Sequence, residues 1–256
     1  MTRLHVETHG TGRPVLFVHG AMGHGRDAWR MQLPLADRWR LLIADRAGFG
    51  ESPGGPQDAE AQADDLAALI PGGADVVGHS YGGVIALLLA AQRPDLVRSL
   101  TVIEPPALGL VRGDPDVDAF VGRTRVVFEN GPSWPEEQAL RTFLLAFGLD
   151  PGEVRLSDLD RRDVAATIRE PAPWTIPIPL ETVAEVGVRT LVVTGGWPAG
   201  ETIPAARTAQ RALAAVARLI IERLRAEHAH FPTAHHDVQS RRQAFNERLL
   251  AFVEGD

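Results

Sequence analysis

Short apolar runs alternate with longer helical patterns in the first and last thirds of the chain. Each run is rich in Val, Leu or Ile and ends where polar or glycine-rich residues begin. Six runs predict buried strands, at 15–18, 40–44, 74–77, 99–103, 190–193 and 218–221. The alternation predicts an α/β fold, a mostly parallel twisted sheet with helices on both faces. Ligands of such sheets bind beyond the carboxyl ends of the strands, so we expect the functional residues there.

Two segments predict helices of different kinds. Residues 81–92 are apolar on nearly every face, which predicts a helix buried against the sheet, and Pro94 would end it. Phe245, Leu249 and Phe252 recur at helical spacing among charged residues. This spacing predicts an amphipathic C-terminal helix that closes the core.

The alternation breaks down between the first and last thirds. We therefore predict an inserted helical lid over 107–186 and an α/β core formed by 1–106 plus 187–256. One lid helix should begin at Asp114-Pro115. A second should begin at a capping box of Ser133 and Glu136 and end at Gly148.

Composition narrows the classes of function. The 256 residues, 45% of them apolar, suffice for one large domain with an insertion. A formal net charge of −7 provides no basic field for phosphates, so we expect no nucleic-acid partner. No apolar run is long enough for a bilayer, and the first residues do not resemble a signal peptide. We expect a cytoplasmic protein that acts without a membrane.

The segment Gly78-His79-Ser80-Tyr81-Gly82 lies between a predicted strand and a predicted buried helix. A serine hydroxyl becomes a nucleophile only when a base takes its proton, and it must stand clear of the backbone. A sharp strand-to-helix turn meets the second requirement, and the glycines leave room for it. This context predicts Ser80 as a nucleophile.

Two further motifs follow the first two predicted strands of the core. They are His19-Gly20-Ala21-Met22-Gly23 and Asp45-Arg46-Ala47-Gly48-Phe49-Gly50-Glu51-Ser52. Together with the turn at Ser80 they make the chain resemble a lid-bearing α/β-hydrolase over nearly its whole length. The resemblance implies acyl transfer from Ser80, with an oxyanion hole formed by the backbone N–H groups of Ala21 and Tyr81.

The resemblance also implies a histidine base between the last strand and the C-terminal helix. Four candidates lie there: His228, His230, His235 and His236. Family members often read Gly-His-Phe-Pro at this place, and His230-Phe231-Pro232 matches the last three residues, which favours His230. The same histidines with Asp237 could share a zinc ion, but their spacing resembles no zinc signature, so we expect no metal.

The third triad member would orient the imidazole. The commoner place in the family follows the strand at 190–193, where the nearest carboxylate is Glu201. The other place is one strand earlier, where Glu104 stands at the tip of the strand and Pro105 follows it. We favour Glu104, with Glu201 as the alternative acid and a dyad without an acid as a third possibility.

These residues predict a serine hydrolase that cleaves a carboxylic ester or lactone of a medium-sized apolar small-molecule substrate, without a cofactor, as a monomer or homodimer. We expect Met22, Trp134 and Phe143 to contact the substrate. The alternatives are hydrolysis of a carbon–carbon bond or perhydrolysis on the same triad. A non-catalytic small-molecule receptor of the same fold is the alternative from another class.

Overall fold

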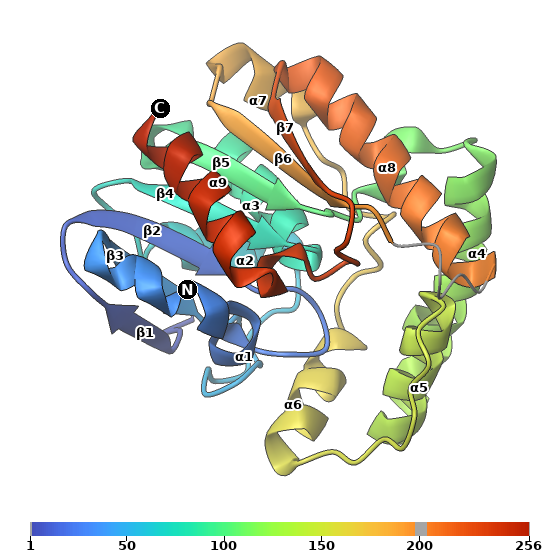
Figure 1. The fold of residues 1–256 in the computed structure, drawn as a ribbon. Coiled ribbons are helices and arrows are strands. Elements are labelled where there is room, and N and C mark those ends of the chain that lie inside the picture. The colour runs from blue at the N-terminus through green and yellow to red at the C-terminus, as the bar shows by residue number, and fades with distance from the viewer. Residues whose placement is uncertain (1, 198–203, 256) are drawn as a thin grey trace.

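A seven-stranded sheet forms the centre of the molecule (Figure 1). The computed structural model describes residues 2–197 and 204–255. The strand order is β1-β3-β2-β4-β5-β6-β7, and only β1 runs antiparallel to its neighbour. The strands are β1 (Val6–His9), β2 (Arg13–Val18), β3 (Trp39–Ala44), β4 (Ala74–His79), β5 (Val97–Ile103), β6 (Thr190–Gly195) and β7 (Glu227–Phe231).

Helices cover both faces of the sheet, as the sequence predicts. In β2, Leu16 and Val18 face one apolar core while Val15 and Phe17 face the other, because successive strand residues point to opposite faces. The first core is covered by α2 (Ala59–Ala67), α3 (Tyr81–Gln92), α7 (Leu180–Val186) and α8 (Pro204–Leu224). The second is covered by α1 (Gly25–Trp29), the 3-10 helix η1 (Arg30–Asp37) and α9 (Arg242–Glu254), with the 3-10 helix η6 (Val238–Ser240) beside it.

Five of the six predicted strands and both predicted core helices are confirmed. The strand predicted at 218–221 is wrong, because these residues form the last turns of α8. A short apolar run does not distinguish a buried strand from a buried helix, and here an alanine-rich stretch extends the helix through it. The last strand, β7, therefore begins at Glu227, later than the sequence predicts.

The segment between β5 and β6, residues 107–186, is called the insert below. Apart from α7 it contains the 3-10 helices η3 (Leu108–Val111) and η4 (Gly131–Ser133) and the helices α4 (Pro115–Asn130), α5 (Glu136–Ala146) and α6 (Asp158–Thr167). Figure 1 shows α4, α5 and α6 beyond the ends of the strands. Within the described ranges, no helix has both the length and the apolar character that crossing a membrane requires.

The helix starts in the insert agree only in part with the sequence. Asp114 caps α4 as predicted, accepting from two backbone N–H groups. The capping box predicted at Ser133 is wrong, because α5 begins after Pro135 with no side-chain cap. The capping box of the insert lies instead at Ser157 and Asp160, at the start of α6, a helix that the sequence reasoning missed.

Helix α3 begins in close contact with the end of β2. A Cβ atom added at Gly82 would lie 2.4 Å from the carbonyl oxygens of both Val18 and His19. These are backbone atoms of the sheet and the loop after it, which cannot move aside without moving the strand. The absence of a side chain at Gly82 therefore sets how closely the start of α3 approaches β2.

We expect Gly82→Ala to lower the free energy of unfolding by about 1–3 kcal/mol, or to prevent folding, because the new methyl group has no space. Gly72→Ala is the matched control, since a Cβ there meets nothing within 4 Å. The control should change stability by less than about 1 kcal/mol. Urea unfolding of both variants tests this, and equal stabilities would contradict it.

Candidate active site

Ser80 occupies a strained turn between β4 and α3. Its φ of 52° and ψ of −124° lie outside the regions that L-residues favour. The turn is held because Ser80 N–H donates to Ile103 O at 2.8 Å and Ser80 O accepts from Gly83 N–H at 2.8 Å. Such strain, which costs about 1–3 kcal/mol per residue, is concentrated at functional sites.

Other strained residues gather near this turn. The described non-glycine residues with positive φ are Met22, Ser80, Glu104, Trp197 and Arg225. The first four follow the carboxyl ends of β2, β4, β5 and β6, whereas Arg225 precedes β7. Strained backbone therefore marks the edge of the sheet at which ligands of this architecture bind.

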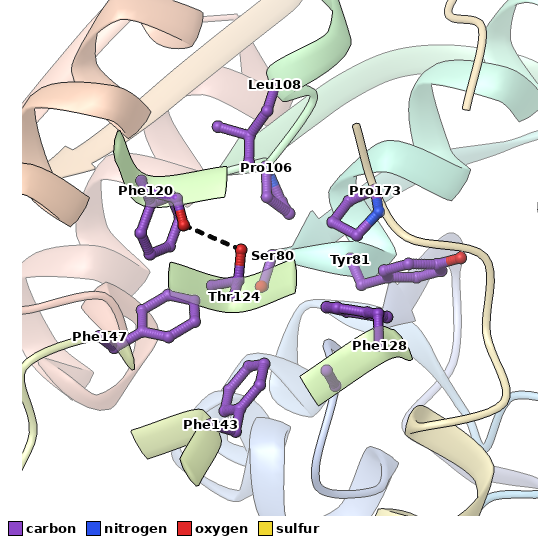
Figure 2. A pocket seen from close by; sticks show the side chains of 11 residues that line it. Ser80, Tyr81, Pro106, Leu108, Phe120, Thr124, Phe128, Phe143, Phe147 and Pro173 are labelled. Carbon is purple, nitrogen blue, oxygen red and sulfur yellow. Dashed lines mark hydrogen bonds between the residues drawn. The ribbon is translucent and has the colours of Figure 1, made fainter. Parts of the chain in front are cut away.

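A narrow apolar cavity lies over Ser80, with about 350 Å³ of space between its atoms when the part open to solvent is included (Figure 2). Figure 2 shows the rings of Phe120 and Phe128 from α4, and of Phe143 and Phe147 from the α5 segment, around it. Thr124 is the polar residue of that wall, and its hydroxyl donates to Phe120 O at 3.0 Å. The full lining is Ala21, Ser80, Tyr81, Pro106, Leu108, Phe120, Thr124, Phe128, Phe143, Phe147 and Pro173.

The two residues predicted for the oxyanion hole, Ala21 and Tyr81, line this cavity together with Ser80. Tyr81 is the first residue of α3, where backbone N–H groups have no acceptor within the helix. The loop that carries Ala21 lies against the nucleophile, because a Cβ at Gly20 would be 2.9 Å from the Cβ of Ser80. Ala21 and Tyr81 thus border the cavity at Ser80.

His230 does not lie where the sequence reasoning places it. It belongs to β7, and its Nδ1 lies 3.0 Å from Thr194 Oγ1, which also contacts His228 Nε2 at 2.9 Å. Its side chain lines a second cavity beside α8, which Glu104 borders but Ser80 does not. The misplaced last strand explains the error, because His230 was expected in a loop and instead lies within a strand.

Another of the four candidate histidines, His236, lies in the loop after β7, close to the strand that ends just before Ser80. Its ring centroid lies 4.8 Å from that of His79, the neighbour of Ser80, and 5.4 Å from that of Phe147 in the cavity wall. His236 Nδ1 lies 3.6 Å from Glu104 Oε2. Both atoms are buried, and within the described part of the chain neither makes a hydrogen bond.

His79 connects this loop to the turn at Ser80. Burial lowers the pKa of His79 to about 3, so its ring is neutral at pH 7. Its Nε2 lies 3.0 Å from His236 O, which can only accept, so Nε2 carries the ring proton. The strand before the nucleophile thus holds the backbone of His236 directly.

Glu104 lies at the end of β5, and one of its carboxylate oxygens accepts from Gly195 N–H at 2.7 Å. Burial raises the pKa of this carboxyl to about 8, although the Gly195 amide, the side chain of Trp197 and the charge of His230 lower it in part. Burial also lowers the pKa of His236 to about 4. The alternative acid, Glu201, lies outside the described residues.

The three residues predicted to contact the substrate are placed differently from one another. Phe143 lines the cavity over Ser80. Met22 and Trp134 pack instead against a small apolar cluster of the insert around Val127 and Ile168. Among the residues that the structure describes, no three of His, Cys, Asp and Glu form a group that could hold a metal ion.

Residues 15–248 match the alpha/beta hydrolase family, and the chain belongs to that family. A pimeloyl-(acyl-carrier protein) methyl ester esterase of Chromobacterium violaceum is 46% identical over 101 residues, 39% of this chain and 40% of that protein. Lipase LipV of Mycobacterium tuberculosis is 39% identical over 109 residues, 40% of this chain and 41% of that protein. The chain therefore matches less than half the length of these two relatives.

The likeness to solved structures extends over nearly the whole chain. Est816, described as an N-acyl homoserine lactone degrading enzyme, has a TM-score of 0.65 and 22% identity. The match covers 98% of this chain and 97% of that one. At this identity it supports the fold alone.

We expect the charge of Glu104 to lower stability as the pH rises. In the folded protein the Glu104 carboxyl keeps its proton up to about pH 8, whereas in the unfolded chain it releases the proton near its ordinary pKa of 4.5. The free energy of unfolding therefore decreases as the pH rises between these two values. The pKa of His236 is lowered to about 4, so this ring makes the free energy of unfolding increase with pH, but only below its ordinary pKa of 6.5. Between pH 6.5 and 8, Glu104→Gln should therefore gain about 1–2 kcal/mol relative to the native chain.

Denaturant unfolding at pH 6.5 and 8 measures this difference. Glu153→Gln is the control, because that side chain is 75% exposed and should leave the pH dependence of the native chain unchanged. If Glu104→Gln retained the native pH dependence, the carboxyl would not hold its proton in the folded state.

Proposed function

We propose that this protein is a serine hydrolase that cleaves a carboxylic ester or lactone of a medium-sized apolar substrate. The observation that carries the proposal is the position of Ser80, on a strained turn that opens onto an apolar cavity between Ala21 and Tyr81. The turn exposes the hydroxyl to a substrate, and the cavity favours an uncharged acyl group.

In the proposed reaction, Ser80 Oγ attacks the acyl carbon while His236 Nε2 takes the hydroxyl proton. In the reacting state Glu104 is ionised, and, facing His236 Nδ1 across 3.6 Å, it orients the ring and stabilises its protonated form. The carbonyl oxygen becomes an oxyanion that accepts from the N–H groups of Ala21 and Tyr81. The ester C–O bond then breaks, and the alkoxide leaves with the proton from His236. Water hydrolyses the acyl-serine by the same steps.

His236 replaces His230 as the base in this proposal. The mechanism requires the ring of His236 to come within hydrogen-bond reach of Ser80 Oγ when substrate is bound. Catalytic hydrogen bonds are often long in ligand-free proteins and shorten in the complex. Contacts of the His236 ring with Glu104, His79 and Phe147 support this choice.

The insert acts as a lid in this proposal, because α4 and α5 supply most of the aromatic wall of the cavity. Four phenylalanine rings enclose the acyl group and exclude water, which strengthens the hydrogen bonds to the oxyanion. The names of the relatives, a methyl ester esterase and a lipase, support ester cleavage.

A fluorophosphonate probe tests the nucleophile. We expect one equivalent of probe to attach to the native chain and none to Ser80→Ala, because only an activated serine hydroxyl displaces fluoride from phosphorus. Intact-protein mass spectrometry measures the added mass. A folded native chain that takes up no probe would falsify the proposal.

The choice of base is tested by comparing three histidine variants in hydrolysis of a p-nitrophenyl ester. His236→Gln should lower kcat by at least about 10³-fold, since it removes the proton acceptor. His230→Gln should retain kcat within about tenfold, because the His230 ring lines the second cavity and not the one over Ser80. A large loss in His230→Gln or His235→Gln, with little change in His236→Gln, would transfer the role of base to that residue.

A further inference from the structure

The two peptide units that flank Ala21 are each held by hydrogen bonds to side chains. The carbonyl of Gly20 belongs to the first unit, and it accepts from Arg46 Nη2 at 2.8 Å and from His19 Nδ1 at 2.8 Å. The N–H of Met22 belongs to the second unit, and it donates to Thr167 Oγ1 at 2.8 Å. Ala21 therefore sits between two anchored peptides.

Peptide geometry converts these contacts into a direction for the Ala21 N–H. In a planar trans peptide the C=O of one residue and the N–H of the next point in opposite directions. Holding the Gly20 carbonyl toward Arg46 and His19 therefore directs the Ala21 N–H to the other side. Ala21 also lines the cavity over Ser80, where the proposed reaction forms its oxyanion.

The donors to the Gly20 carbonyl are themselves fixed. The neutral ring of His19 accepts through Nε2 from the backbone N–H of Arg46 at 3.0 Å. Its single proton therefore lies on Nδ1, facing Gly20 O. Burial, followed by the charge of Arg46, holds the pKa of His19 well below its ordinary value and keeps the ring neutral. Arg46 also donates through Nε to His19 O at 3.0 Å.

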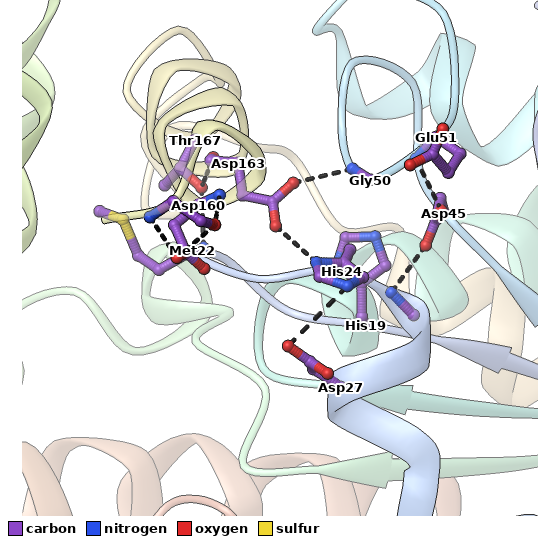
Figure 3. Close-up of polar contacts among 12 residues, drawn as sticks. His19, Met22, His24, Asp27, Asp45, Gly50, Glu51, Asp160, Asp163 and Thr167 are labelled. Atoms are coloured by element: carbon purple, nitrogen blue, oxygen red, sulfur yellow. Dashed lines mark hydrogen bonds and ion pairs between the residues drawn. The ribbon is translucent and has the colours of Figure 1, made fainter. Parts of the chain in front are cut away.

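The insert supplies the far end of both anchors. Arg46 Nη1 forms a fully buried ion pair with Glu170, which lies in the insert just after α6. Thr167, the last residue of α6, accepts from Met22 N–H and donates to Asp163 O at 2.9 Å. Figure 3 shows α6 against the loops after β2 and β3, where Asp163 also contacts His24 Nδ1 at 2.7 Å and Gly50 N–H at 2.8 Å.

We propose that Thr167 and Arg46 are positioning residues that aim the Ala21 N–H at the oxyanion, so that docking of α6 onto the core completes the oxyanion hole. This inference rests on the proposed function. It makes the insert part of the catalytic machinery through the backbone of Ala21, in addition to its part in the cavity wall. Neither residue touches the reacting atoms.

Thr167→Val tests the inference, because it replaces the hydroxyl by a methyl group and leaves the shape of the side chain almost unchanged. The variant leaves Met22 N–H without its acceptor, whereas Thr167→Ser retains the hydroxyl. Losing one oxyanion donor costs about 10²–10³-fold in kcat, so misdirecting one should lower kcat at least about tenfold with KM nearly unchanged. Thr167→Ser should retain kcat within about threefold of the native value.

A trifluoromethyl ketone provides the second measurement, because it forms a tetrahedral adduct with the serine whose oxygen occupies the oxyanion hole. Its inhibition constant should rise in Thr167→Val by about the factor by which kcat/KM falls. Thr142→Val, which removes a hydroxyl that bonds only within α5, is the matched control and should change neither quantity.

A second variant removes the Arg46 donor from the Gly20 carbonyl without leaving a buried charge. Arg46→Met combined with Glu170→Met replaces the ion pair by apolar groups of similar size, an exchange that proteins often tolerate. It should fold and show the same selective loss of kcat and of trifluoromethyl ketone affinity. Thermal unfolding of each variant verifies that the assayed protein is folded.

The outcomes separate this inference from the proposed function. If the native chain hydrolyses no ester, or if Ser80→Ala hydrolyses it equally well, the proposed function fails. If hydrolysis depends on Ser80 but Thr167→Val and the double variant retain native kcat and inhibitor affinity, only the positioning role fails. Equal losses in Thr167→Ser and Thr167→Val would also overturn it, because the hydroxyl would then not be the group that matters.

Discussion

The close approach of α3 to the end of β2 is the constraint on which the site depends. Gly82 allows the first turn of the helix to lie against the carbonyl oxygens of Val18 and His19, and Gly20 allows the loop after β2 to lie against Ser80. Because the chain must turn sharply to bring α3 there, Ser80 adopts its strained conformation. One backbone contact therefore brings together the nucleophile, the first helical amide and the loop that carries Ala21.

Burial determines the charges around this contact. His19 and His79 are surrounded by protein, so both rings stay neutral and each has a single proton with a defined acceptor. Their role is to orient backbone, since a neutral buried imidazole is a rigid donor and acceptor. Glu104 and His236 face each other with buried atoms that make no hydrogen bond in the described part of the chain. When either of these two side chains gains a proton, the charge next to the other side chain changes.

The insert contacts the core through two different kinds of interaction. Helices α4 and α5 contribute apolar rings to the cavity, whereas α6 contributes polar and charged side chains to the loops after β2 and β3. Apolar packing tolerates small displacements of a wall, but the buried ion pair of Arg46 and Glu170 is satisfied only when α6 is docked. The part of the insert that makes these polar contacts is thus the part that reaches the backbone near Ser80.

Local patterns in the sequence determined five strands of the sheet, the helices α3 and α9, and the turn at Ser80. A buried parallel strand and the turn at Ser80 are each specified by consecutive residues, and the glycines at 78 and 82 favour a sharp turn over other local conformations. The tertiary structure decided which histidine faces Glu104. An apolar run at 218–221 suits a strand or a helix equally, and the packing of α8 made it helical, which moved His230 into β7 and left His236 in the loop. The contacts of Arg46 and Thr167 with the loop around Ala21 join residues far apart in the chain, and no local pattern specifies such distances.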